Sequence, residues 1–368
     1  MSDDEPDEEL LAFLRKSLGL DGPKSTKQKD LRVLKNAQFV CDNSIDVAID
    51  PQGTKKAAST IWTRMQKNAY SLKTWSTHEL HPEAKDESTV NFIFTMDLLN
   101  FCFWTDDEQG DSFGIDYHGA RWTGYWSLVA ALQRALEEGI PITSSDYWQD
   151  EAECTDEVLR YVFRSDTPTP MPLIEERIAC LREAGRVLYE RFDCGFVTCI
   201  EEAGGSASAL VNILIENFPC FKDESRFHGK TVTFHKRAQI LVADLWACFE
   251  AEGHGKFHDI DTITMFADYR IPQMLYTLGC ILYSPPLEHA IRSLHPIPHS
   301  SSWEVQLRGC SIWCVELIRR QILREYPGAS VNAILIDFFL YDMSKEVEKG
   351  AEDREEMIPH HRTKSIYY

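Results

Sequence analysis

The chain has 368 residues, a formal net charge of −20 and a pI of about 5.0. This charge argues against a polynucleotide-binding protein, which needs a basic surface to neutralise phosphates, but it leaves room for one nucleotide in a pocket. Apolar residues make up 43% of the chain and aromatic residues 11%, which is enough for a sizeable core.

The sequence also indicates a compartment. The first residues, MSDDEPDEE, do not have the pattern of a signal peptide, and no apolar run approaches the roughly 20 residues of a membrane span. We therefore expect a soluble intracellular protein, cytoplasmic or alternatively nuclear, whose eleven cysteines are reduced thiols. None of the cysteines has zinc-binding spacing, and no metal or other cofactor is predicted.

The first part of the chain predicts a tail followed by helices. Residues 1–30 are acidic and then lysine-rich, so we expect a disordered tail ahead of a single domain over 31–368. Helices are predicted over 31–41 and 54–69, with the segment between them, NSIDVAIDPQG, as a loop. His78 and His81 follow with no third ligand nearby, so they predict no metal site, and the residues alone favour a half-buried structural histidine.

The run NFIFTMDLLNFCFW over 91–104 sets Asp97 and Asn100 among apolar residues. A helix would place both side chains on one face and a strand would place them on opposite faces, and periodicity does not decide between the two. Either way, both polar groups need partners inside the core.

The next segments predict a hairpin and then mostly helices. Phe113, Ile115 and Tyr117 alternate ahead of a His-Gly turn, which is typical of a β-hairpin. Helices are expected over 126–138 and over most of 140–230. SPPLEHAIRSLHPIPHSSS is interpreted as a loop region, and EVQLRGCSIWCVELIRRQILREY as a long helix. The predicted fold class is therefore mainly α: a single compact helical domain with a small β-hairpin.

The stretch from Phe234 to Pro272 is the most informative part of the chain. FHKRAQILVADLWACFE is apolar nearly all the way round, which is typical of a buried helix. It nevertheless carries Lys236, Arg237 and Asp244, and buried charges are unfavourable unless they are paired or functional.

Two further carboxylates stand out. Asp268 lies between Phe266 and Tyr269, just ahead of a predicted helix whose first turn holds Pro272; a helix N-terminus favours an ionised carboxylate, and an ordinary cap is the alternative interpretation. Asp337 lies on an apolar helical face, with Asp342 at its boundary. Such a carboxylate indicates a functional site or a core ion pair.

Eight segments along the chain resemble one known family. They are HELHP, MDLLNFCFW, GYWSLVAALQRALEEGIPIT, RSDTPTPMPLIEER, HKRAQILVADLW, TITMFADYRIPQ, RGCSIWCVELIR and ILIDFFLYD. In this order they resemble the queuosine salvage protein family, the queuosine 5′-phosphate N-glycosylase/hydrolases, from about Phe39 to Tyr368. The resemblance implies a mainly helical fold, similar in core architecture to the helix-hairpin-helix DNA glycosylases.

The resemblance also implies an activity and a set of site residues. Members cleave the N-glycosidic bond of queuosine 5′-phosphate and release queuine, which is returned to tRNA. By motif, Asp268 is implied as the nucleophile or transition-state stabiliser, with Lys236 in a supporting role. Met265 and Phe266 are implied as base contacts, and His78, Asp337 and Asp342 as queuine-binding positions. No metal is required by this chemistry.

Two other functions remain open at this stage. A DNA-glycosylase-like enzyme acting on a damaged base would need a basic surface for the duplex, which the net charge disfavours. A non-catalytic helical interaction protein would be expected to show repeats of fixed period, and none is evident.

Overall fold

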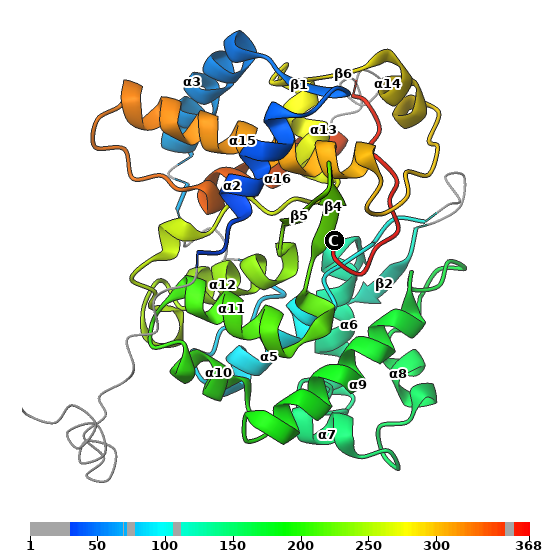
Figure 1. The fold of residues 1–368 in the computed structure, drawn as a ribbon. Coiled ribbons are helices and arrows are strands. Elements are labelled where there is room, and N and C mark those ends of the chain that lie inside the picture. Colours follow the sequence, from blue (N-terminus) through cyan, green and yellow to red (C-terminus); the bar gives the residue numbers. More distant parts are fainter. Residues whose placement is uncertain (1–29, 69, 72–77, 106–111, 350–356) are drawn as a thin grey trace, which may run out of the picture. The chain divides into compact units, whose positions relative to one another are not determined.

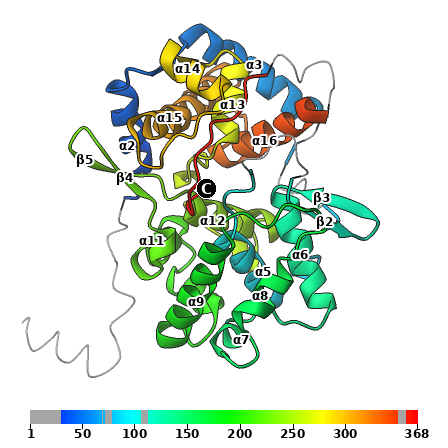
Figure 2. The same ribbon diagram turned by 90° about the vertical axis from the view of Figure 1, so that its right-hand side faces the viewer.

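The computed structural model describes residues 30–68, 70–71, 78–105, 112–349 and 357–368. The chain divides into two units, residues 1–30 and 31–368. The predicted disordered tail falls almost wholly on residues 1–29, outside the described part, and the predicted domain boundary stays a prediction. Everything below concerns the second unit, drawn as the coloured ribbon in Figures 1 and 2.

The described residues form fourteen α-helices and three two-stranded sheets, which confirms the mainly helical prediction. Within these residues, no helix combines the length and apolar content that a bilayer crossing requires. The helices form two groups, and both groups supply walls to the candidate site.

The first helix group joins the beginning of the unit to its end (Figure 1). Its centre is α15 (Ser302–Glu325), the long helix that the sequence predicts. The closest approach is at Gly309, where an added Cβ would lie 2.5 Å from a methyl group of Val40. The absence of a side chain at Gly309 therefore lets α2 lie directly against α15. The helices packed around α15 are α2 (Val33–Asp42), α3 (Pro51–Lys67), α13 (Arg270–Thr277) and α16 (Ala333–Lys349).

The second helix group comes from the middle of the chain. Its central helix is α12 (Lys236–Cys248), whose residues are nearly all buried, as its sequence predicts. The segment that the sequence left undecided is a helix, α5 (Glu87–Leu98), and it packs on α12. The remaining members are α6 (Tyr125–Glu137), α7 (Ser145–Gln149), α8 (Asp156–Val162), α9 (Ile174–Arg191), α10 (Phe196–Glu202) and α11 (Ala207–Asn217).

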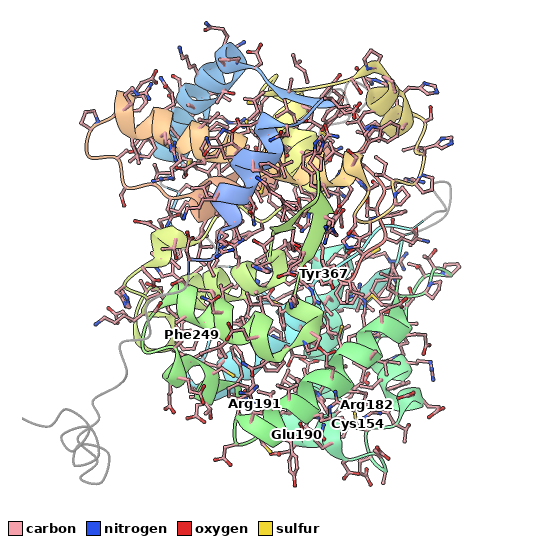
Figure 3. The ribbon with its side chains drawn as sticks, viewed as in Figure 1. Cys154, Arg182, Glu190, Arg191, Phe249 and Tyr367 are labelled. Atoms are coloured by element: carbon pink, nitrogen blue, oxygen red, sulfur yellow. The ribbon has the colours of Figure 1, made fainter. Side chains whose placement is uncertain are left out.

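A partly buried arginine joins parts of this group through backbone carbonyls. Arg182 of α9 donates to the carbonyl oxygens of Trp148, at 2.9 Å, and of Cys154. Figure 3 shows Arg182 beside Cys154 at the foot of the group. The connection between α7 and α8 is thereby tied to α9.

The sheets show where local sequence patterns succeed and fail. The predicted hairpin is present as β2 (Gly114–Tyr117) and β3 (Ala120–Thr123). A second hairpin, formed by β4 (Glu224–Phe227) and β5 (Lys230–Thr233), was not predicted. The expected loop over 43–53 was wrong in part, because it contains β1 (Val47–Ile49), which pairs with a strand distant in the sequence, β6 (Ile281–Tyr283).

The predicted loop after Tyr283 is also wrong in part, since it contains helix α14 (Pro285–Arg292). Its two prolines occupy the first turn, where a helix needs no backbone N–H donors from them. Proline content was therefore a misleading sign of irregular structure here.

The last twelve residues run between the two helix groups in both ribbon views (Figures 1 and 2). The Tyr368 hydroxyl donates to Glu304 of α15 at 2.8 Å, and the Tyr368 carbonyl oxygen accepts the Cys102 N–H at 3.0 Å. Tyr368 is therefore hydrogen-bonded to Glu304 in the first helix group and to Cys102 in the second.

Candidate active site

A cavity of about 950 Å³ lies where these segments meet. Its size falls in the range of ligand pockets, roughly 300–1,000 Å³. Its walls come from the chain around Tyr70 and His78, the loop after α5, the start of α6, one face of α12, the start of α13, α16 and the C-terminal segment.

Asp268 is held at the start of α13. Its Oδ1 accepts the N–H groups of Arg270 at 2.8 Å and Ile271 at 2.9 Å, the first two residues of the helix. These donors and the positive end of the helix favour a negative charge on the carboxylate. The predicted position of Asp268 just ahead of a helix N-terminus is confirmed, and the carboxylate is half-buried at the cavity wall.

Lys236 begins α12 and also lines the cavity. Burial lowers the pKa of its ammonium group, and the charges of Asp268, Asp97 and Asp337 act in the opposite direction. Its backbone N–H donates to Asp223 at 3.1 Å, which fixes the start of the helix. The Lys236 ammonium therefore lies among carboxyl groups, with Asp268 having the largest electrostatic effect.

Asp337 of α16 lies close to the same charges. Its Oδ1 accepts the Phe266 N–H at 3.0 Å, and the side chain is only 5% exposed. Burial raises its pKa well above the usual range, and the charge of Asp268 raises it further. Burial and the nearby charge of Asp268 therefore both favour the protonated form of Asp337.

Asp342 lies one turn further along α16, where it accepts the Tyr70 hydroxyl at 2.7 Å. Burial raises its pKa, and the bond from Tyr70 opposes that shift. Both residues line the cavity.

An aromatic wall surrounds His78. The His78 ring stacks on Trp126 with 3.3 Å between centroids and 10° between planes, and it meets Trp122 edge-on at 5.6 Å. Its Nδ1 accepts the Leu80 N–H at 3.2 Å, and burial lowers its pKa, so the ring is neutral at pH 7. The His78 ring is thus a flat, uncharged surface in the cavity lining.

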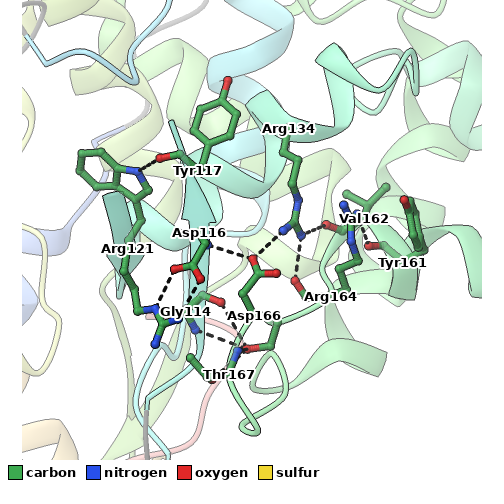
Figure 4. Close-up of polar contacts among 12 residues, drawn as sticks. Gly114, Asp116, Tyr117, Arg121, Arg134, Tyr161, Val162, Arg164, Asp166 and Thr167 are labelled. Atoms are coloured by element: carbon green, nitrogen blue, oxygen red, sulfur yellow. Dashed lines mark hydrogen bonds and ion pairs between the residues drawn. The ribbon is translucent and has the colours of Figure 1, made fainter. Parts of the chain in front are cut away.

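The β2–β3 hairpin that precedes this wall is anchored from behind (Figure 4). Arg134 of α6 donates to Asp166 at 2.9 Å and to the Arg164 carbonyl oxygen at 2.8 Å. Asp166 in turn accepts the N–H of Asp116 on β2 at 2.9 Å. The loop with the sequence RSDTP therefore fixes the hairpin against α6.

The loop after α5, whose residues Asn100 to Thr105 line the cavity, is held by two fully buried arginines. Arg177 donates to the carbonyl oxygens of Leu99, Phe101 and, at 3.1 Å, Cys102. Arg237 donates to those of Leu98 and Cys220. These bonds satisfy the carbonyl groups that the end of a helix leaves unpaired.

Comparison with known proteins identifies the family of the chain. A family model described as queuosine salvage protein matches residues 80–368. The chain belongs to the queuosine salvage protein family.

Three relatives of the family illustrate its range, and each carries the name queuosine 5′-phosphate N-glycosylase/hydrolase. The Mus musculus protein is 43% identical over 341 residues, which cover 90% of this chain and 97% of the relative. The Schizosaccharomyces pombe protein is 42% identical over 348 residues, 92% and 99% of the two chains. The Sphaerobacter thermophilus protein is 37% identical over 338 residues, 92% and 98% of the two chains.

Most of the site residues expected from the family resemblance meet at this one cavity. The lining includes Asp268, Lys236, His78, Phe266, Asp337 and Asp342. Met265 does not belong to the lining, because its side chain is 0% exposed and packs in the core behind Phe266. The structure therefore separates the two residues that the motif offered together as base contacts.

Other lining residues were not found from the sequence. Tyr269, Arg270 and Tyr341 flank the carboxylates, and Tyr368 comes from the last position of the chain. None of them interrupts an apolar pattern, so the sequence carried no signal for them. Asp244 did carry one, as a charge in a buried helix, and it lines the cavity. Among the described residues, no cluster of three or more potential metal-binding side chains is present.

Proposed function

We propose that this chain hydrolyses the N-glycosidic bond of queuosine 5′-phosphate and releases queuine for salvage into tRNA. Membership of the family supports the substrate, and one observation of the structure carries the chemistry. The carboxylate of Asp268 is fixed at the N-terminus of α13, close to the buried carboxyl group of Asp337, in a cavity large enough for a nucleotide.

In this proposal Asp268 stabilises the sugar. Cleavage of an N-glycosidic bond builds positive charge on the ribose, which becomes oxocarbenium-like. A carboxylate already oriented by two N–H donors needs no rearrangement as that charge develops. Lys236 lies close enough to Asp268 for the charge of Asp268 to act on its ammonium group, and it assists by holding the carboxylate in place.

Asp337 serves the departing base. The base leaves with the bonding electrons and needs a hydrogen bond or a proton. Burial and the charge of Asp268 favour the protonated form of Asp337, and in that form its carboxyl group is a hydrogen-bond donor. A carboxylate could instead form a charge-assisted pair with the amine of queuine. We assign that pairing to Asp342 at the cavity edge.

The base itself is held between flat surfaces. His78, supported by Trp126, presents one aromatic face to the cavity, and Phe266 lines another side. Stacking of this kind is tolerant of the modified ring and adds to the burial of its apolar surface.

We extend the proposal to architecture: the core resembles that of the helix-hairpin-helix DNA glycosylases. The mainly helical fold, with an aspartate at a helix N-terminus facing a cavity between helix groups, supports this similarity. Superposition of α12, α13 and the Asp268 backbone on such an enzyme tests it.

The experiment for the activity is direct. Purified protein is incubated with queuosine 5′-phosphate, and free queuine is separated by chromatography and quantified. Guanosine 5′-phosphate serves as the control for general nucleotide cleavage, and unphosphorylated queuosine tests the need for the phosphate. Absence of queuine release, with guanine released from the control nucleotide instead, would overturn the proposal.

A further inference from the structure

A buried ion-pair cluster lies behind the cavity wall. It consists of Arg308 and Glu304 of α15 and of Asp223, which lies just ahead of β4, and the three side chains are at most 2% exposed. All three lie outside the cavity lining. Arg308 Nη1 donates to Asp223 Oδ1 at 2.9 Å and to Glu304 Oε1 at 3.3 Å, and Nη2 donates to Asp223 Oδ2. The bond to Asp223 is therefore bidentate, a geometry that fixes the orientation of a guanidinium group.

The Arg308 guanidinium group is also bound to the segment that carries Asp268. Its Nε donates to the carbonyl oxygen of Ala267 at 2.9 Å. That carbonyl belongs to the planar peptide group that contains the Asp268 nitrogen, so a shift of one moves the other. Arg308 therefore fixes the backbone immediately ahead of the Asp268 carboxylate.

The same cluster fixes the start of α12. His235, at the N-cap, has a left-handed backbone with φ of 51° and makes no capping hydrogen bond through its side chain. Asp223 supplies acceptors instead, since its carbonyl oxygen accepts the N–H groups of Phe234 at 3.0 Å and His235 at 3.3 Å. Its Oδ2 accepts the Lys236 N–H at 3.1 Å. Because that oxygen also accepts Nη2 of Arg308, the position of Lys236 depends on Arg308.

Two aromatic rings pack against the guanidinium group. The Cζ atom of Arg308 lies 4.2 Å from the ring centroid of Phe234 and 4.4 Å from that of Tyr368. The Tyr368 hydroxyl also donates to Glu304, the other carboxylate of the cluster. Since Tyr368 lines the cavity, the cluster holds a third part of the cavity wall.

We infer that Arg308 is a positioning residue for the proposed reaction, whose guanidinium group sets the separation of Asp268 and Lys236 by fixing the backbone at both. This inference rests on the proposed catalytic role of Asp268. A buried ion-pair cluster is weak evidence of a gain in stability, because loss of hydration opposes the attraction of the charges. A rigid, planar group with five donors can bind several segments at once, and the flexible point charge of a lysine does not replace it in that role.

Arg308→Lys separates positioning from charge. Lysine keeps a cation for Asp223 and Glu304, but it does not reproduce the fork that also binds the Ala267 carbonyl oxygen. Because a misplacement of about 1 Å can cost about 10²-fold in rate, we expect kcat for queuine release to fall about 10- to 10²-fold. KM should stay within about threefold of wild type, as for loss of an interaction made in the transition state. A kcat within about threefold of wild type, or a rise in KM alone, would overturn the inference.

Arg182→Lys is the matched control. It makes the same change at an arginine outside the cavity lining that also donates to two carbonyl oxygens and a carboxylate, those of Trp148, Cys154 and Asp156. We expect kcat and KM to be unchanged in this variant, whatever its thermal midpoint. An equal fall in kcat in the two lysine variants would indicate a general effect of loosened packing and would contradict the role of Arg308.

Asp223→Asn keeps the inference testable if Arg308→Lys does not fold. Loss of this charge leaves Arg308 paired with Glu304, so the buried cluster becomes neutral. One amide oxygen then replaces the two carboxylate oxygens that Arg308 and the Lys236 N–H share. We expect kcat to fall about tenfold or more with KM near the wild-type value. Wild-type kcat in a folded Asp223→Asn protein would also overturn the inference.

A double-mutant cycle shows whether Arg308 acts through Asp268. In protein that already carries Asp268→Asn, Arg308→Lys should lower the single-turnover rate of queuine release by less than about threefold, because the group that it positions has been removed. Fully additive losses would contradict the inference. The cycle also keeps the two proposals apart. A fully active Asp268→Asn protein refutes the catalytic assignment, whereas an inactive Asp268→Asn protein with a fully active Arg308→Lys protein refutes the present inference alone.

Discussion

Asp268 shows how a single residue can cap a helix and still be open to a ligand. It caps α13, accepting two backbone N–H groups, and it also faces the cavity. The two interpretations offered by the sequence were therefore not exclusive. The cap is what holds the carboxylate still, and this fixed orientation is what the proposed chemistry needs.

Asp268→Asn should retain the fold and lose base release. Asn keeps an oxygen for the two N–H donors but carries no negative charge, so we expect kcat to fall about 10²–10³-fold or more. Queuine release from queuosine 5′-phosphate measures the effect.

The chain offers a matched control. Asp259 accepts the backbone N–H groups of Ala207 and Ser208 at the start of α11 and does not line the cavity. Asp259→Asn makes the same chemical change at another helix terminus and should leave kcat unchanged. Equal activity of the two variants would contradict the role of Asp268.

Asp337→Asn separates proton donation from binding. Asn can still accept the Phe266 N–H and donate a hydrogen bond, but it has no acidic proton to transfer. We expect kcat to fall about 10²-fold or more, as for loss of a general acid, while the dissociation constant of queuine changes little. Kinetics and calorimetric titration with queuine provide the two readings. Weaker queuine binding with unchanged kcat would indicate that Asp337 binds the base and does not donate the proton.

At the scale of elements, local pattern predicted what is stabilised locally. The alternation of Phe113, Ile115 and Tyr117 identified β2, and the apolar surface of α12 identified a buried helix. The pairing of β1 with β6 could not be predicted, because each strand is three residues long and its partner is distant in the sequence. The lining of the cavity could not be predicted for the same reason, because it joins residues from 70 to 368, which only the tertiary fold brings together.

The hairpin anchor at Arg134 has a testable energetic consequence. The side chain of Arg134 is 10% exposed and that of its partner Asp166 is 34% exposed. Removal of the guanidinium group therefore leaves a partly buried carboxylate without its cation. Arg134→Met should lower the free energy of unfolding by about 2–3 kcal/mol. Because the hairpin precedes Trp126, we also expect a higher KM. Urea denaturation and steady-state kinetics measure these effects.

Arg160→Met is the control for this change. Arg160 pairs with Glu175 at 2.9 Å, but these side chains are 44% and 65% exposed. Solvent screens such a pair, so its loss should change the free energy of unfolding by less than about 1 kcal/mol. Equal losses for Arg134→Met and Arg160→Met would show that the anchor is only a surface contact.

For the whole molecule, the net charge of −20 predicts no useful affinity for DNA. A filter-binding titration with duplex DNA at physiological salt should therefore give no submicromolar binding, while queuosine 5′-phosphate is turned over under the same conditions. Submicromolar binding of the duplex would favour the DNA-glycosylase alternative.

The buried titratable groups predict a stability maximum near pH 6.5. Burial lowers the pKa of His235 and of His361 to about 4, whereas unfolded histidine titrates near ~6.5. Between these values the unfolded state binds more protons, so stability falls as pH drops below about 6.5. Asp337 has the opposite sign: its raised pKa makes the folded state bind more protons above about pH 4, so its contribution falls as pH rises.

Chemical denaturation across pH 4–9 tests this balance. Between about pH 4 and 6.5, His235, His361 and a third histidine, His360, whose pKa burial also lowers, outnumber Asp337 and Asp97, so stability rises with pH. Above about pH 6.5 only the aspartates contribute. Asp337→Asn should therefore flatten the alkaline side of the curve. A maximum below pH 5 would contradict the assignment of neutral buried histidines.

The first helix group takes α2 and α3 from the start of the unit and α15 and α16 from its end. During synthesis, Val33, Val40 and Ile61, all buried in the finished protein, leave the ribosome long before α15 exists to cover them. These apolar faces remain available to chaperones while the whole middle of the chain is made. A ribosome that stalls anywhere before α15 thus leaves a nascent chain whose helices are uncovered. That chain also lacks the parts of the cavity wall that Asp337 and Tyr368 supply. Maturation of the cavity is therefore tied to completion of translation.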